Sequence, residues 1–140
     1  MTCSVSYSVG AVDRSTGGRT GTLALGRGEI QTPVFMPVGT QAAIRSMPPH
    51  FLDDIGVQII LANTYHLNQR PGEGTVAKLG GLHEFMCVDL PILTDSGGFQ
   101  IWSLSARARV EEEGVTFASP RDGSRRLLTP ERAVEVQEAL

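Results

Sequence analysis

The sequence predicts an α/β fold that is preceded by a small antiparallel β-sheet. Short segments near the N-terminus alternate polar and apolar residues or lie between glycine-rich turns, as antiparallel strands do. Further along, two apolar runs, 57–62 and 92–94, each end abruptly in polar side chains, and helical segments lie between them. A strand, a helix and a strand with polar groups gathered at one end are typical of a parallel α/β sheet or barrel.

The number of these units limits how complete such a fold can be. The 140 residues hold about two or three strand–helix units, whereas a closed (β/α)8 barrel needs eight units and typically about 250 residues. We therefore expect either a small open fold or the first part of a longer protein. The final predicted helix runs to Leu140 without a stop signal, which favours the second.

The composition is that of a globular protein, because 41% of the residues are hydrophobic and only 19% are charged. The net charge of −3 gives no overall cationic field, so contact with RNA would need a local basic patch or lie outside this chain. Two cysteines, Cys3 and Cys87, are too few for a disulfide framework, which favours a reducing compartment. No secretory signal or membrane span is evident, so we expect a soluble, cytoplasmic protein without a membrane partner.

The N-terminal part predicts three strands, at 4–9, 20–25 and 29–36. Residues 4–9 alternate in polarity, which predicts a half-buried strand. The other two strands flank Gly26-Arg27-Gly28 and read as an antiparallel hairpin unit. Proline cannot donate to a sheet ladder, so Pro33 and Pro37 belong at strand ends or on an edge. Residues 38–40 are then expected to form a loop at the end of a strand.

The middle of the chain predicts short helices between the apolar runs. One opens at Pro48-Pro49 and ends before Gly56, with an apolar face made of Phe51, Leu52 and Ile55. A second runs through 75–79 and stops at Gly80-Gly81, and a helical turn follows at 82–86.

The C-terminal part predicts a hairpin and a helix. Ile101, Trp102 and Leu104 are expected in the core, and 111–114 is expected to be a surface turn. Asp122-Gly123 lies between strand-like runs at 115–118 and 126–128, which predicts a hairpin. The last helix begins with Thr129 as N-cap and Pro130 at its first position, and Ala133, Val136 and Leu140 line one of its faces.

The stretch from Pro91 to Gln100 carries the strongest chemical signal. Asp95 follows the apolar run 92–94, at the strand end where α/β folds bind ligands. Gly97 and Gly98 let the backbone turn sharply and come close to a ligand, and Phe99 offers a face for a flat ring. Ser96 and Gln100 add hydrogen-bonding groups. The alternative is a plain loop in which the aspartate caps a backbone amide.

Four blocks in one order make the chain resemble the tRNA-guanine transglycosylases, also called queuine tRNA-ribosyltransferases. The blocks are 32–40 (TPVFMPVGT), 63–67 (NTYHL) with 70–72 (RPG), 93–100 (LTDSGGFQ), and 113–117 (EGVTF) with 122–123 (DG). The resemblance implies a (β/α)8 TIM barrel preceded by an antiparallel sheet. Residues 1–140 would be the N-terminal part of one catalytic domain, with antiparallel strands over about 1–32 and the first barrel units over 33–140.

The resemblance also implies an activity. Family enzymes replace guanine at the anticodon wobble position of a tRNA with a GUN anticodon by a 7-deazaguanine, preQ1 or queuine. An aspartate nucleophile forms a covalent ribosyl-enzyme that the incoming base resolves, by the logic of retaining glycosidases.

Single residues carry over to matching positions. Asp95 matches the general acid/base, and Ser96, Gly97, Gly98 and Phe99 match the substrate-binding loop. Asn63 and Thr64 match residues that hold the acid in the empty site, with strand-end capping as the alternative. Val38 and Leu61 match positions that line the base pocket, with ordinary core packing as the alternative.

Three family features do not match residues of this chain. One is much of the base pocket together with the basic tRNA surface, which lie downstream in the family. The nucleophilic aspartate and the zinc site, Cys-x-Cys-x-x-Cys with a distant histidine, are expected beyond residue 140. The cysteines and histidines present lack ligand spacing, so we expect no metal and no cofactor within this chain. The full-length protein is expected to be a homodimer, and this chain alone is expected to be inactive.

Two other classes of function stay open on the sequence. The chain could belong to a non-catalytic partner of the same fold that binds RNA or a sister subunit. It could also be a small stand-alone α/β binding domain.

Overall fold

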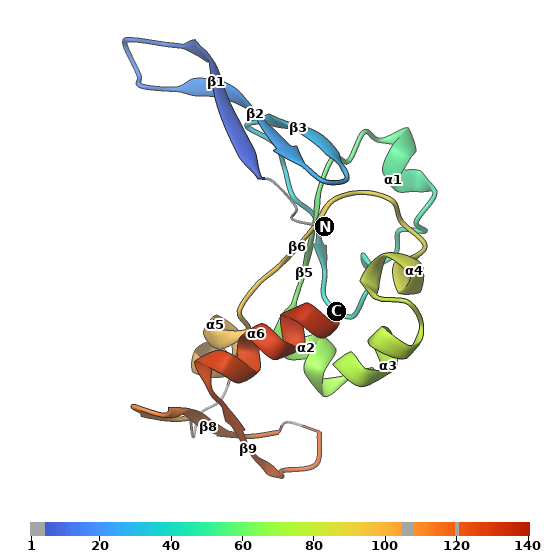
Figure 1. Cartoon of the computed structure of the whole chain (residues 1–140), viewed down its shortest axis with the longest axis vertical. Coiled ribbons are helices and arrows are strands. Elements are labelled where there is room, and N and C mark those ends of the chain that lie inside the picture. The colour runs from blue at the N-terminus through green and yellow to red at the C-terminus, as the bar shows by residue number, and fades with distance from the viewer. Residues whose placement is uncertain (1–4, 105–107, 120) are drawn as a thin grey trace.

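A computed structural model describes residues 5–104, 108–119 and 121–140. In these residues three three-stranded sheets combine with six short helices. Figure 1 shows the N-terminal sheet at the top, a parallel pair of strands in the middle and the C-terminal hairpin at the bottom, with helices beside the middle layer. None of the helices in the described ranges is long and apolar enough to cross a membrane.

The N-terminal sheet is antiparallel, as predicted, in the order β1 (Ser6–Val12), β2 (Arg19–Leu25) and β3 (Gly28–Thr32). The third strand ends four residues earlier than the predicted 36, because Pro33 has no N–H to continue the ladder. The prediction that the first strand is half-buried is wrong, since every residue of β1 is exposed. Within the described residues, β1 is an edge strand that pairs with β2 alone.

The middle sheet is parallel, with β5 (Ile60–Ala62) between β4 (Val38–Gly39) and β6 (Ile92–Thr94). Residues 38 and 39, predicted as a loop, are a strand because they pair with Leu61 and Ala62. The strand predicted at 57–62 begins only at Ile60. Its buried side carries Ile60 and Ala62, both fully buried in the main core.

The opposite face of this sheet is open. Val38, Leu61 and Leu93 are paired across the three strands and therefore share one face. Val38 is 50% exposed and Leu93 is 43% exposed. One face thus packs on helices while the other presents apolar side chains to the outside.

Four short helices cover the buried face: α1 (Phe51–Asp54), α2 (Thr64–Gln69), α3 (Glu73–Lys78) and α4 (Leu82–Met86). Their buried side chains are Leu52, Leu67, Val76, Leu82 and Met86. The predicted face of α1 is only partly right, because Leu52 is buried whereas Phe51 and Ile55 are 47% and 60% exposed. A helix of one turn can direct few side chains into the core. Helix α2 was not predicted from the sequence.

The C-terminal part contains α5 (Gly98–Leu104), β7 (Arg109–Glu111), β8 (Gly114–Ala118), β9 (Arg125–Leu128) and α6 (Pro130–Ala139). The predicted hairpin is confirmed by the antiparallel pairing of β8 with β9. Ile101 is buried, but the prediction of a buried Trp102 is wrong, since that ring is 72% exposed. The side chain of Leu104 lies outside the described part of the structure.

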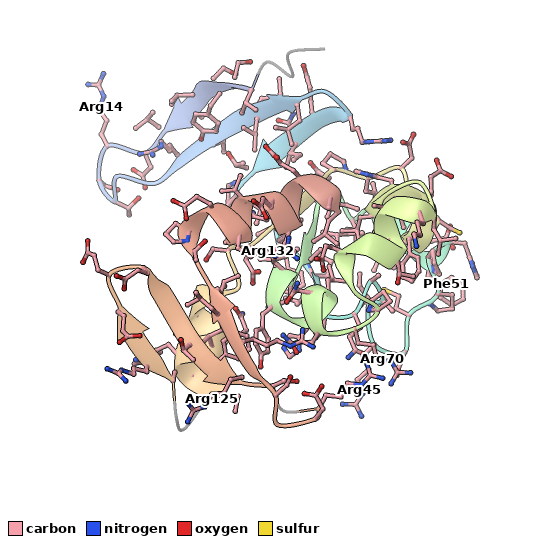
Figure 2. All side chains as sticks on the ribbon, turned by 60° about the horizontal axis from the view of Figure 1, so that its bottom comes forward. Arg14, Arg45, Phe51, Arg70, Arg125 and Arg132 are labelled. Carbon is pink, nitrogen blue, oxygen red and sulfur yellow. The ribbon has the colours of Figure 1, made fainter. Side chains whose placement is uncertain are left out.

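Helix α6 joins the C-terminal part to the main core. Thr129 caps it by accepting a hydrogen bond from the Arg132 backbone N–H at 3.1 Å, and Val136 is fully buried. Gln137 Nε2 donates to the carbonyl and hydroxyl oxygens of Thr94, at 3.1 and 3.0 Å. Arg132, labelled in Figure 2, pairs with Glu73 of α3. Helix α6 is therefore fixed to the β6 strand that ends at Asp95.

Candidate active site at the end of β6

Asp95 lies directly after β6, and its carboxylate accepts three hydrogen bonds. Oδ1 accepts from the backbone N–H of Thr64 at 2.8 Å and from that of Gly97 at 3.1 Å. Oδ2 accepts from Asn63 Nδ2 at 2.9 Å. The Asp95 backbone N–H continues the sheet by donating to the carbonyl of Ala62 at 3.3 Å. The acid is thus held between the ends of two adjacent parallel strands.

Asn63 is the link between those strand ends. It is the N-cap of α2, where its Oδ1 accepts from the His66 backbone N–H at 3.2 Å, while its Nδ2 serves Asp95. The residue is only 5% exposed. The structure therefore brings Asn63 and the Thr64 backbone N–H onto the carboxylate. The capping interaction that was the alternative is present for Asn63, whereas the buried Thr64 hydroxyl has no partner among the described residues.

Gly97 allows the loop after Asp95 to press against α2. Its φ is +74°, and a Cβ at this position would lie 2.9 Å from the Tyr65 backbone nitrogen. A side chain would therefore meet both backbone strain and a close contact. Gly98 instead begins α5, and its N–H donates to the Ser96 hydroxyl at 3.3 Å.

Two aromatic rings stand in solvent beside this loop. Phe99 is 67% exposed, and its ring lies 5.8 Å from that of Trp102 at an angle of 50°. Exposed aromatic surface of this kind is available for stacking. Trp102 was not predicted to be at the surface, because an apolar residue next to buried Ile101 reads as core. Gln100 has a buried Oε1 with no partner among the described residues.

Tyr65 and His66 follow the acid-holding residues on α2. Tyr65 packs with Ile101 and Phe117 in a second apolar cluster, and burial raises the pKa of its hydroxyl. Its ring lies 5.1 Å from that of His66 and 5.7 Å from that of Phe117. Packing accounts for the position of Tyr65 without a catalytic role.

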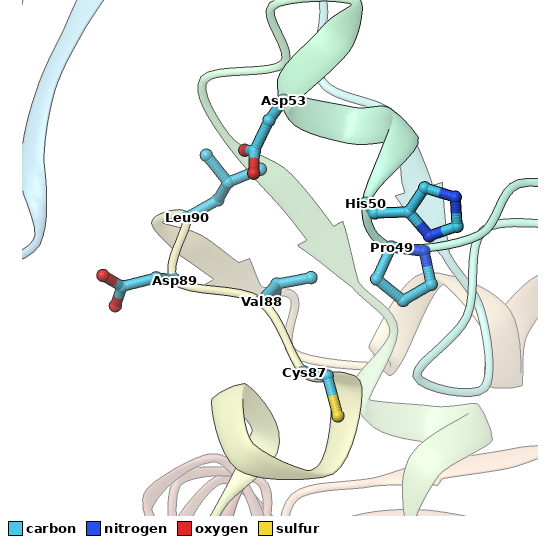
Figure 3. A pocket seen from close by; sticks show the side chains of 7 residues that line it. All are labelled: Pro49, His50, Asp53, Cys87, Val88, Asp89 and Leu90. Carbon is cyan, nitrogen blue, oxygen red and sulfur yellow. The ribbon is translucent and has the colours of Figure 1, made fainter.

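A separate hollow of about 520 Å³ lies at the opposite, amino ends of β5 and β6. Figure 3 shows its lining, which includes His50, Cys87 and Asp89; the Asp89 carboxylate points away from the other two side chains. Across the described ranges, histidine, cysteine and acidic side chains form no group of three that could hold a metal ion. Cys3 lies outside the described residues. This part of the chain does not fit a zinc site, and no chemical step here depends on one.

The fold and this edge together define an α/β protein with a fixed carboxylate at a strand end, next to an exposed ring. A family model described as queuine tRNA-ribosyltransferase matches residues 13–140. The chain belongs to the queuine tRNA-ribosyltransferase family.

Several curated relatives carry the same name. The protein from Solidesulfovibrio magneticus is 58% identical over 134 residues, which cover 96% of this chain and 35% of the relative. The protein from Pelotomaculum thermopropionicum is 54% identical over 136 residues, covering 97% of this chain and 37% of the relative. The protein from Zymomonas mobilis is 54% identical over 135 residues, covering 96% and 34%. The chain thus spans about a third of the length of these relatives.

Proposed function

We propose that the complete protein exchanges guanine at the wobble position of a GUN-anticodon tRNA for a 7-deazaguanine, preQ1 or queuine, with Asp95 as general acid/base. The observation that carries this proposal is the carboxylate held at the end of β6 by Asn63, Thr64 and Gly97, in a chain whose relatives are named for this transfer. The protein would be a pentosyltransferase of queuosine tRNA modification that works in the cytoplasm.

Asp95 would work by changing hydrogen-bond partners. An ionised carboxylate has about four acceptor positions, and three are used here. An incoming base would replace Asn63 or Thr64 and donate its ring N–H to Asp95. As the base nitrogen bonds to the ribose, the ester between the ribose and the nucleophilic aspartate would break and release that carboxylate, and the ring proton would pass to Asp95. Asn63 and Thr64 would hold the acid again after the product leaves.

The surrounding residues would recognise the flat base. Phe99 would lie against its ring, and Ser96, Gly97 and Gly98 would contact its polar edges. Val38 and Leu61 would line the pocket from the open face of the parallel sheet. The partial exposure of that face in the described chain supports such a role.

We propose further that β4, β5 and β6 are the first strands of a (β/α)8 barrel within one catalytic domain. Their parallel order and the helices on one face support this. The open apolar face would be the barrel interior. The nucleophilic aspartate, the zinc ligands and the homodimer contacts would then come from the remainder of the longer protein.

A radiolabelled guanine exchange assay tests the proposal. The complete protein should incorporate labelled guanine into tRNA with a GUN anticodon and not into tRNA with a different wobble base. The 140-residue chain alone should give only background. A complete protein that binds tRNA without exchange would instead be a non-catalytic partner of the same fold.

A further inference from the structure

We propose that a hollow beside α2 is a ribose-phosphate subsite for the RNA strand whose base reaches Asp95. Its volume is about 270 Å³, and it is lined by Gln41, Tyr65, His66, Gln69, Arg70 and Arg121. This inference rests on the proposed function. It assigns a binding site to the ribose-phosphate backbone of the substrate, which the base pocket does not contact.

The charge of the lining favours an anion. It contains two arginines and no carboxylate. The ion pairs among the described residues involve Arg27, Arg109 and Arg132, so Arg70 and Arg121 are not neutralised by an acid there. Figure 2 shows Arg70 at the outer edge of the molecule. The net charge of the chain is −3, so the two arginines form a local basic site on an otherwise acidic chain. A planar guanidinium can bind a phosphate through two parallel hydrogen bonds.

Gln69 lines the hollow, and its side-chain amide oxygen lacks a hydrogen-bond donor within the described part of the chain. Gln69 Oε1 is buried and has no hydrogen-bond partner among the described residues, and a phosphate cannot supply one. A ribose 2′-hydroxyl in the hollow would donate to this oxygen once the Gln69 side chain turns toward it, because Oε1 is buried in its present position. Cationic donors together with an unpartnered acceptor match a ribonucleotide backbone better than a free phosphate or a DNA strand.

The position agrees with a strand that also reaches Asp95. Helix α2 begins at Thr64, whose N–H holds the Asp95 carboxylate, and Arg70 caps its other end. Six residues of helix span about 9 Å, a separation on the scale of a nucleotide. The volume of about 270 Å³ is large enough for a phosphate group.

Binding of tRNA to the complete protein as a function of salt tests this subsite. Arg121→Gln, on an exposed turn, and Arg70→Gln/Arg121→Gln should each weaken binding, the double variant by roughly tenfold near 0.1 M salt. The logarithm of the association constant for tRNA decreases with the logarithm of the salt concentration, and this slope should become less steep by about 0.7 for each arginine removed. The matched control is Arg14→Gln/Arg19→Gln on the exposed β1–β2 hairpin, which should leave the slope unchanged. A melting curve of each variant reports folding, and Arg121→Gln alone suffices if Arg70→Gln fails to fold.

The role of Gln69 as an acceptor for a ribose hydroxyl is tested by a separate binding measurement. Replacing the anticodon-loop riboses by deoxyriboses should weaken binding to the wild type and have less effect on Gln69→Leu. Unchanged salt slopes in the arginine variants would overturn the subsite, and so would a change in oligomeric state without a change in RNA affinity. Absence of base exchange in the wild type would overturn the proposed function instead, because the salt slopes measure the hollow independently of turnover.

Discussion

At the scale of residues, the site depends on how a carboxylate is held and could be released. Asn63 uses both ends of its amide, one for the α2 N-cap and one for Asp95. A change at Asp95 therefore affects the acid and its holder together.

Asp95→Asn in the complete protein should preserve folding and nearly abolish exchange. The new amide oxygen can still accept from Thr64 and Gly97, but its NH2 group would face Asn63 Nδ2, so one hydrogen bond worth about 1 kcal/mol is lost. Loss of the proton acceptor should reduce the rate by about a hundredfold or more. Thermal melts and guanine exchange measure the two effects. Asp89→Asn, at an exposed carboxylate, is the control, and full activity of Asp95→Asn would remove Asp95 from the mechanism.

Gly97→Ala should destabilise the protein more than Gly123→Ala does. Both glycines have nearly the same positive φ, +74° and +73°, but only Gly97 has the Tyr65 backbone against its Cβ position. The shared backbone strain costs about 1 kcal/mol, and the contact at Gly97 should raise the total toward about 3 kcal/mol. Denaturant unfolding compares the two variants. Equal losses would show that the approach to Tyr65 is not tight.

Local sequence predicts some features of the site residues and misses others. Asp95 was placed correctly at a strand end because an apolar run that stops at an acid is a local signal. The contacts of Asn63 and Thr64 with Asp95 join residues about 30 positions apart, so they were available only through the family resemblance. The exposure of Trp102 and Phe51 depends on which partners fold over them, which composition does not reveal.

At the scale of elements, α6 connects the hairpin region to the core. Its N-cap was predicted from Thr129-Pro130, and the structure confirms the capping bond. Helix α2 and strands β4 and β7 were missed because they are short and owe their existence to tertiary pairing rather than to periodicity.

Thr129→Ala should lower the free energy of unfolding by about 1 kcal/mol, because the Arg132 N–H at the start of α6 loses its acceptor. Thr129→Ser keeps a hydroxyl and should recover most of the loss. Chemical denaturation of the three proteins measures the difference. A serine variant as unstable as the alanine variant would mean that the methyl group, rather than the cap, matters.

The contact between α3 and α6 should make stability depend on acid pH. Burial raises the pKa of Glu73, but hydrogen bonds from its own backbone, Arg132 and Asn68 outweigh this and hold it below the ordinary 4.5. The ionised form is therefore favoured in the folded state. Its stabilisation is fully present above about pH 4.5 and is lost as the pH falls through the lower, folded-state pKa.

Glu73→Gln should accordingly lower the melting temperature at neutral pH, and its difference from the wild type should shrink in acid. The effect should be modest because Arg132 is 41% exposed. Glu135→Gln removes the more exposed partner of Arg132 and should change the melting temperature less. A Glu73→Gln difference that stays constant down to pH 3 would contradict the pKa argument.

At the scale of the whole molecule, the parallel sheet is covered on one side and open on the other. The sequence predicted β5 and β6 and the functional end that they share, because buried strands and polar strand ends are local patterns, but it missed β4. It could not predict that the apolar face of Val38, Leu61 and Leu93 is open in the described residues. In the proposed barrel, this face would become the interior wall beside the base.

The most direct test of the account is a structure of the complete protein bound to guanine or a 7-deazaguanine. We predict that the Asp95 carboxylate accepts a hydrogen bond from the base, that Phe99 lies against the ring, and that Asn63 or Thr64 has given up its bond to the acid. A base bound elsewhere, with Asp95 still held by Asn63 and Thr64, would contradict the proposal.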